Sequence, residues 1–241
     1  MTTLPYQLAQ NVFFCFSGSH LVFLDLPRNK YFCLNAHNTR LATHLFPGLA
    51  DRNDNSSGPD SIDIRKEAQR VAAALVERGL LTQGDTKCGE AQPLRIQTVR
   101  RVAVCERMGR EPAVRIGHLT TFFHASLKAS WKLRWYSMLR TVRSIVAQKD
   151  RRIEPHSVNQ QVLSDLVRIF HRLRPFYGRK YLCLYDSLAL LQFLAAYRLF
   201  PQWVFGVKAE PFGAHCWVQE GDCVLNDAVE FVREYTPIMA T

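Results

Sequence analysis

The stretch Tyr181-Leu182-Cys183-Leu184-Tyr185-Asp186-Ser187 begins the most apolar segment of the chain, which continues to Leu199. Because this segment is apolar on nearly every side, it predicts a buried helix. Pro175 and Gly178 end the helix before it, so Cys183 falls at the N-terminus of the new helix. The free N–H groups and the helix dipole at that position stabilise a thiolate. A buried structural cysteine is the alternative for Cys183 taken alone.

A strand is predicted at Pro211-Phe212-Gly213-Ala214-His215-Cys216-Trp217-Val218, followed by a hairpin turn centred on Gly221. In that register His215 lies opposite Asp227, and directly opposed side chains share one face of a sheet. Asn226 would then point to the other face. The register therefore selects Asp227, rather than its neighbour, as the carboxylate that holds the imidazole of His215.

Cysteine, histidine and aspartate in this order supply the parts of thiol catalysis. Cys183 would attack as a thiolate, His215 would act as base, and Asp227 would fix the imidazole tautomer. The same register leaves Cys216 as a core thiol on the opposite face. Two alternatives stay open. His215 could be a packed core histidine, and a slip of one residue in the hairpin would exchange the assignments.

Length and composition describe a globular chain. It has 241 residues, of which 47% are apolar and 22% charged, enough for one large or two small domains. No secretory signal and no run of roughly 20 apolar residues is present, so we expect a cytoplasmic protein without a membrane span. The seven cysteines form no Cys-x-x-Cys pair and fit no familiar zinc spacing, which predicts reduced thiols and no metal site.

The first ninety residues predict a small domain of strands followed by helices. Short apolar runs at 11–16, 21–26 and 31–34 are separated by turns and read as antiparallel strands. Asn35 can cap a helix over 36–46, and a second helix runs to Arg78. We expect an α+β protein with a winged-helix-like domain at 1–85, a linker at 86–93 and a second domain at 94–241.

The second domain predicts helices packed on an antiparallel sheet. Helices are expected at 94–108, 119–147, 158–173 and 182–199, and strands at 203–208, 214–219 and 223–225. Charge is uneven: residues 1–90 are neutral, 91–180 carry +14 and 181–241 carry −4. The basic middle suggests either an anionic partner or intramolecular docking, or simply solvated Arg-rich helix faces.

The run 181–190, together with Gly206-Val207, residues 211–218 and Asn226-Asp227, resembles the lasso-peptide B proteins, the leader peptidases of lasso-peptide biosynthesis. The resemblance implies that residues 94–241 form their transglutaminase-like, papain-related cysteine peptidase domain. It implies the same roles as the hairpin register: Cys183 as nucleophile, His215 as base and Asp227 as orienter. This chain departs from the family's pattern in having Asp186 where a basic or neutral residue is usual, and Cys216 where alanine is usual.

The N-terminal domain resembles the small leader-binding domain that is often fused ahead of such peptidases. In that family the leader adds as a strand to the edge of a sheet and packs on a helix, so main-chain pairing supplies affinity. The resemblance places leader binding on an edge strand and a helix, at Lys30, Tyr31, Phe32, Cys33, Leu34, Val71 and Leu75. The alternative is that these residues are an ordinary winged-helix core.

The resemblance implies two partners, a precursor peptide bound through its leader and an ATP-dependent lasso cyclase, an asparagine-synthetase-like macrolactam synthetase. The chain contains no Gly-rich phosphate loop, so any ATP would be used with that cyclase. One rival function is an acyltransferase or transglutaminase on the same trio. Another is a nucleic-acid-binding winged-helix regulator, which is disfavoured because the basic charge lies outside the winged segment.

Overall fold

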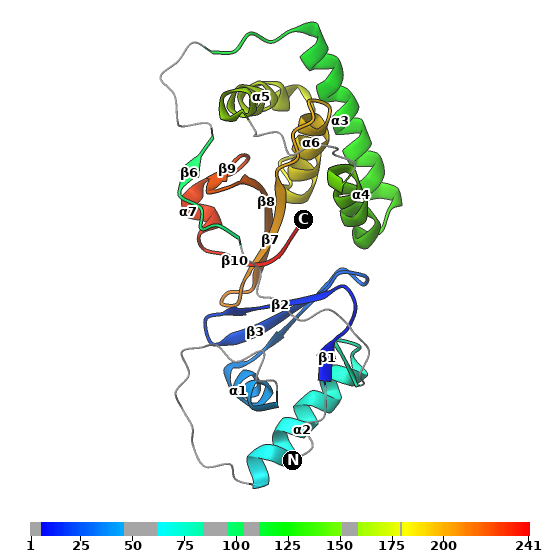
Figure 1. The fold of residues 1–241 in the computed structure, drawn as a ribbon, viewed down its shortest axis with the longest axis vertical. Helices are drawn as coiled ribbons and strands as arrows, with labels where there is room; N and C mark the ends of the chain where they lie inside the picture. The colour runs from blue at the N-terminus through cyan, green and yellow to red at the C-terminus, as the bar shows by residue number, and fades with distance from the viewer. Residues whose placement is uncertain (1–5, 46–61, 84–95, 104–110, 151–158, 179) are drawn as a thin grey trace. The chain divides into compact units, whose positions relative to one another are not determined.

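The computed structural model describes residues 6–45, 62–83, 96–103, 111–150, 159–178 and 180–241 (Figure 1). The chain divides into two compact units, residues 1–93 and 94–241, each described below by itself. The linker predicted at 86–93 lies outside the described residues. The predicted α+β class is confirmed, because a three-stranded sheet with helices is followed by helices and an antiparallel-rich sheet.

The first unit is built on an antiparallel sheet of order β2-β3-β4. Its strands are β2 (Val12–Ser17), β3 (His20–Asp25) and β4 (Lys30–Leu34). Ser17 pairs with His20, so only Gly18-Ser19 turns the chain, and the φ of +59° at Gly18 suits a two-residue hairpin turn. The central strand β3 is buried on both faces, and among the described residues β2 and β4 are the two edges of the sheet.

Two helices cover this sheet's core. In α1 (Ala36–Leu45) the expected cap is present, since Asn35 Oδ1 accepts a hydrogen bond from Asn38 N at 2.8 Å. Helix α2 (Ile62–Glu77) ends where Gly79 adopts a φ of +71°. Two short strands that close the unit, β1 (Tyr6–Leu8) and β5 (Leu81–Gln83), pair antiparallel.

The second unit contains a five-stranded sheet of order β10-β7-β8-β9-β6. Its strands are β10 (Thr236–Ala240), β7 (Gln202–Lys208), β8 (Gly213–Glu220), β9 (Cys223–Val224) and β6 (Arg101–Val102). The helix predicted at 94–108 is wrong for the described residues 96–103. Arg101 and Asp222 form an ion pair of 2.7 Å, and beside it Arg101 and Val102 pair with Cys223 and Val224 as a short parallel ladder.

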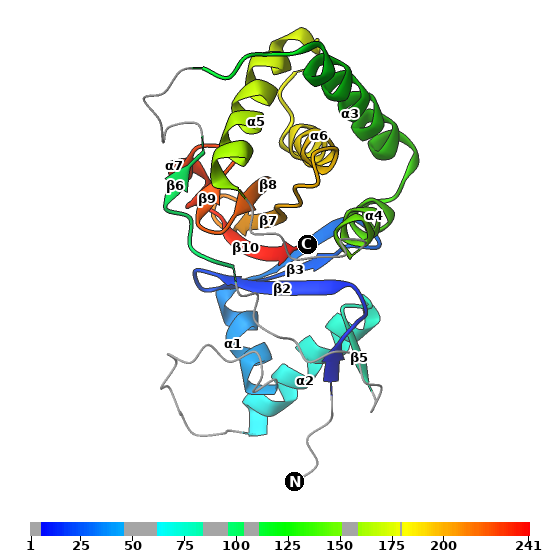
Figure 2. The same ribbon diagram turned by 45° about the horizontal axis from the view of Figure 1, so that its top comes forward.

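Helix α6 (Cys183–Ala195) lies at the centre of this unit. Figure 2 shows it nearly end-on, with α5 (Gln160–Leu173), α3 (Ile116–Trp135), α4 (Met138–Asp150) and the sheet around it. Ten of its thirteen residues are buried, as its apolar composition predicts. None of the described helices is both long and apolar enough to cross a membrane.

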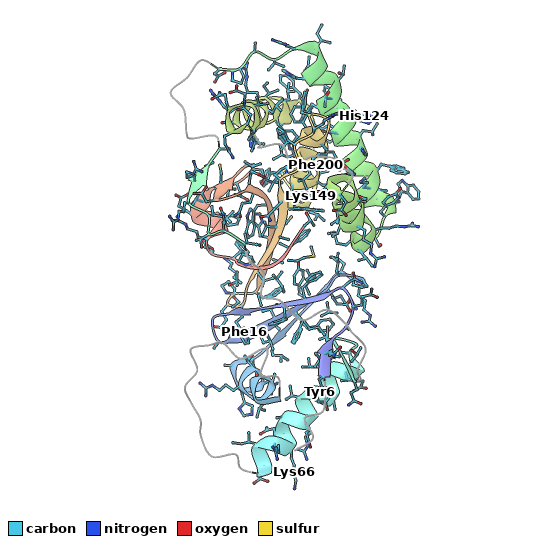
Figure 3. All side chains as sticks on the ribbon, viewed as in Figure 1. Tyr6, Phe16, Lys66, His124, Lys149 and Phe200 are labelled. Atoms are coloured by element: carbon cyan, nitrogen blue, oxygen red, sulfur yellow. The ribbon has the colours of Figure 1, made fainter. Side chains whose placement is uncertain are left out.

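The single helix predicted over 119–147 is wrong, because the chain forms two helices with a break at Tyr136-Ser137. Helix α3 buries one face, with Phe122, Ala125 and Ala129, against α6. Its outward face carries an exposed row spaced four residues apart, namely Phe123, Leu127, Trp131 and Trp135. Side chains project from this outer side of α3 in Figure 3. At the end of α4, Lys149 Nζ donates to the carbonyl of Thr241 at 3.3 Å.

The hairpin between β8 and β9 has a different register from the predicted one. Glu220 pairs with Cys223, so the turn contains two residues, and Gly221 supplies the positive φ of +59° that such a turn requires. The whole register is therefore shifted by one residue from the alignment centred on Gly221. Strand β9 ends at Val224, Leu225 N still donates to the carbonyl of Val218 at 2.9 Å, and residues 225–227 form a bend.

Candidate active site

Cys183 is the first residue of α6, as predicted, and two contacts fix that helix end. The carboxylate of Asp186 accepts a hydrogen bond from Leu182 N at 2.7 Å and forms an ion pair with Arg174. Arg174 also donates to the carbonyls of Tyr177 and Lys180, at 3.0 and 3.1 Å. The basic side chain thereby holds the end of α5 against the start of α6. It also supplies a positive partner for Asp186, the carboxylate that lies one turn after the nucleophile.

The thiol of Cys183 lies at the edge of β8, where β9 no longer covers that strand. In a sheet, every second backbone N–H points to the same edge. At this edge Val218 N donates to Asn226 Oδ1 at 2.7 Å, and Cys216 N, two residues earlier, donates to the sulfur of Cys183. The sulfur of Cys183 therefore lies close to the backbone of Cys216.

His215 and Asp227 lie in hydrogen-bond contact although the hairpin register differs from the predicted one. The distance between His215 Nε2 and Asp227 Oδ2 is 2.6 Å, and both side chains are largely buried. The bend at 225–227 brings Asp227 back to the histidine. The ring of His215 packs against Phe231 and Tyr235, with centroids 5.0 and 5.2 Å apart.

A glycine on the neighbouring strand makes room for this packing. Gly206 pairs with His215 across the β7–β8 ladder. A Cβ atom at Gly206 would lie 2.7 Å from the indole of Trp217, far inside contact distance. The Trp217 ring stacks on that of His215, so the absence of a side chain at Gly206 leaves room for the indole of this stacked pair.

Hydrogen bonds convert Cys183 and His215 into an ion pair. The Cys216 thiol and the His215 ring donate to Cys183, and they lower the pKa of its thiol to about 4 against the opposing effect of burial. Burial lowers the pKa of His215, but its hydrogen bonds to Asp227 and Cys183 outweigh that effect and raise the pKa to about 9. Between these values the pair consists of a thiolate and an imidazolium.

The role of Cys216 was missed in the sequence. It does lie on the face opposite His215, where it contacts Ser187 of α6, yet Cys183 at the strand edge reaches both residues. The neighbouring Cys183 sulfur and complete burial raise the pKa of Cys216 well above its usual value. Cys216 therefore stays protonated and donates its S–H to the thiolate. The position of Cys216 directly after His215 was the sequence signal that could have indicated this role.

Asn226 and Ser187 form a buried brace between the bend and α6. Asn226 Nδ2 donates to Ser187 Oγ at 3.0 Å, and Ser187 Oγ donates to the carbonyl of Cys216 at 3.2 Å. Asn226 also accepts from Val218 N, as described above, and Tyr181 Oη donates to its carbonyl at 3.0 Å. The brace positions the residue before Asp227, so it holds the carboxylate against His215.

Replacing Asn226 by alanine should lower the free energy of unfolding of the second unit by roughly 2 kcal/mol or more, because Val218 N–H and Ser187 Oγ lose their buried partner. Urea denaturation would measure this loss. The double variant Asn226→Ala/Ser187→Ala should lose less than the sum of the two single variants, since they share one hydrogen bond. Strict additivity would show that the brace does not act as a unit.

Alkylation of Cys183 should report the ion pair directly. Because the pKa of its thiol is lowered to about 4, the thiolate persists as pH falls, and the iodoacetamide rate constant should stay level from about pH 8 to about pH 5 before declining. In His215→Ala the inflection should move up towards the ordinary thiol range. Mass spectrometry of the modified peptide would follow the reaction. A wild-type inflection near pH 8 would contradict the ion pair.

The predicted leader-binding residues lie in the first unit. Lys30, Tyr31, Phe32, Cys33 and Leu34 form β4, an edge strand of its sheet. On α2, Leu75 is buried in the core and Val71 packs against that core while half-buried. Leader binding there stays a prediction. Within the described residues, no group of three or more His, Cys, Asp and Glu side chains could hold a metal ion.

Residues 123–240 match the family model described as the Transglutaminase-like superfamily. This range contains Cys183, His215 and Asp227, and it identifies a transglutaminase-like domain in the second unit. Such a domain supports acyl transfer or hydrolysis through a cysteine, as in transglutaminases and cysteine peptidases. Comparisons with curated proteins and with solved structures found no significant match.

Proposed function

We propose that this protein is a cysteine peptidase that removes the leader from the precursor of a lasso peptide. The observation that carries the chemical part is the Cys183–His215–Asp227 arrangement at the N-terminus of α6, in which the thiol pKa is lowered to about 4. The resemblance of residues 181–190, 211–218 and 226–227 to the lasso-peptide B proteins supports the choice of substrate.

The proposed reaction starts from the resting ion pair of the Cys183 thiolate and the His215 imidazolium. The Cys183 thiolate attacks the scissile carbonyl, and a tetrahedral intermediate forms. The His215 imidazolium donates its proton to the leaving amine, which departs as the new N-terminus of the core peptide. The neutral His215 then takes a proton from water, and the resulting hydroxide attacks the thioester and releases the leader with a free carboxylate. Asp227 stabilises the imidazolium in the first step and fixes the ring throughout.

The first unit would bind the leader. Its edge strand β4 can accept an added strand through backbone hydrogen bonds, as strand addition requires. The freed core peptide would pass to an ATP-dependent lasso cyclase. In this proposal ATP is used with that cyclase.

Acyl transfer is the second candidate, and the family match favours it as much as hydrolysis. Both reactions share the thioester on Cys183 and differ only in what attacks it. Water gives a leader with a free carboxylate, whereas an amine gives an amide. The pair of His215 and Asp227 can deprotonate either nucleophile.

The test is incubation of the full chain with the candidate lasso precursor peptide encoded beside its gene, with and without a simple alkylamine, followed by mass spectrometry. A leader that ends in a free carboxylate in both reactions supports the peptidase. An alkylamide of the leader supports transfer. An intact precursor, in the absence and in the presence of the cyclase and ATP, would overturn the proposed substrate.

A further inference from the structure

Three large apolar side chains remain exposed beside the reacting pair. Tyr181 and Leu182, which immediately precede Cys183, are 56% and 57% exposed, and Phe231, which packs on His215, is 40% exposed. Most apolar residues of α6 and of the sheet are buried. We call Tyr181, Leu182 and Phe231 the apolar rim.

Side-chain contacts hold two members of the rim, and a backbone contact holds the third. Tyr181 is anchored through its hydroxyl to the carbonyl of Asn226, the residue that precedes Asp227. Phe231 is fixed by edge contacts with His215 and with Tyr235, whose ring centroid lies 5.4 Å away. Leu182 is the N-cap residue of α6, and its N–H is held by Asp186. The side chains of Tyr181 and Phe231, held in this way, lose little further conformational freedom when a ligand covers them.

The rim adjoins both reacting residues. Tyr181 and Leu182 directly precede Cys183 in the chain, and Phe231 packs on the imidazole that protonates the leaving amine. An acyl group bound to Cys183 therefore begins next to the exposed side chains of the apolar rim. Ordered apolar side chains left exposed beside reacting residues can receive an apolar group of a substrate, whereas a polar group would need placed donors and acceptors.

We propose that the apolar rim is a specificity subsite that takes a large apolar side chain of the peptide substrate, close to the scissile amide. This inference rests on the proposed function and deepens it. The substrate class is a peptide with at least one bulky aliphatic or aromatic residue within reach of Cys183. Discrimination comes from burial of that side chain against Phe231, Leu182 and the ring of Tyr181.

The experiment uses tripeptidyl acyloxymethyl ketones as probes on the full chain. The Cys183 thiolate attacks the methylene carbon of the ketone, a thioether forms and the carboxylate leaves. Each position of a trialanine acyl part is changed in turn to Leu, Phe, Ser or Asp. We expect Leu or Phe at one position to raise the second-order rate constant about 10-fold or more over Ser at that position.

The variants Phe231→Ala and Leu182→Ala should lower this ratio of apolar to polar rate constants by roughly 3-fold or more. Because both rate constants come from the same variant, their ratio is unaffected by a general loss of thiol reactivity in that variant. A matched control is Leu127→Ala, which removes an exposed leucine from the outward row of α3 and should leave the ratio unchanged. A wild-type ratio near one at every position, or ratios unchanged in both rim variants, would overturn the subsite.

Iodoacetamide tests the reactivity of Cys183 separately from the apolar rim, because this reagent is too small to need a specificity subsite. Rapid modification of Cys183 at about pH 5 together with equal rates for all peptide probes would refute the rim and leave the cysteine chemistry intact. Failure of both reagents to modify Cys183 would refute the proposed function and the subsite with it.

Discussion

Turnover of the precursor should fall by about 10⁴-fold or more when Cys183 is replaced by alanine, because the proposed reaction forms its thioester on this sulfur. The neighbouring Cys216 cannot substitute for it, since the pKa of its thiol is raised well above the usual value and it stays protonated. Single-turnover assays by mass spectrometry would measure the loss. Cleavage at the wild-type rate in Cys183→Ala would refute the mechanism.

Two thiol variants serve as controls for this result. Cys216→Ala removes the S–H donor and should retain measurable turnover, but with the pKa of Cys183 shifted upwards, because that hydrogen bond is the largest cause of its lowering. Cys223→Ala removes another buried thiol of the same sheet and should keep nearly full activity. A loss in Cys223→Ala equal to that in Cys183→Ala would mean that folding, not chemistry, had been measured.

The variant Asp227→Asn should lower kcat by roughly 10²- to 10⁴-fold. An amide can still accept a hydrogen bond from His215, but it carries no charge to stabilise the imidazolium. The pKa of His215 should therefore fall from about 9, and the upper end of the active pH range should fall with it. A pH–rate profile would show this shift.

Asp222→Asn is the matched control, since it makes the same chemical change at an aspartate of the β8–β9 turn. Asp222 is paired with Arg101 at 2.7 Å, in the turn rather than at the reacting pair. This variant should leave the pH profile in place. If Asp222→Asn and Asp227→Asn reduced kcat equally, Asp227 would have no special part in orienting His215.

The elements whose apolar pattern is strong were predictable from sequence. Helix α6 follows from its nearly continuous apolar composition, and Cys183 at its start follows from Pro175 and Gly178 before it. Asn35 as a helix cap also follows from local chemistry. Strand β6 was missed, because its two residues are fixed by pairing with β9, more than a hundred residues away. Such non-local pairing leaves no local signature.

The hairpin shows why a correct contact can follow from a wrong register. We expected His215 and Asp227 to be directly opposed, yet the ladder is shifted by one residue. The contact forms because Asn226 places its side-chain oxygen where a backbone carbonyl would stand, so the chain leaves the sheet and turns Asp227 towards the ring. A buried asparagine that replaces a backbone partner cannot be distinguished in sequence from one in a loop.

The end of β9 also has a consequence for self-association. An open strand edge with unpaired amides is a template on which a second chain can assemble into a larger sheet. At this edge of β8, Val218 N is satisfied by Asn226 and Cys216 N by Cys183. The nucleophile and the brace thus shield the strand from intermolecular β-pairing.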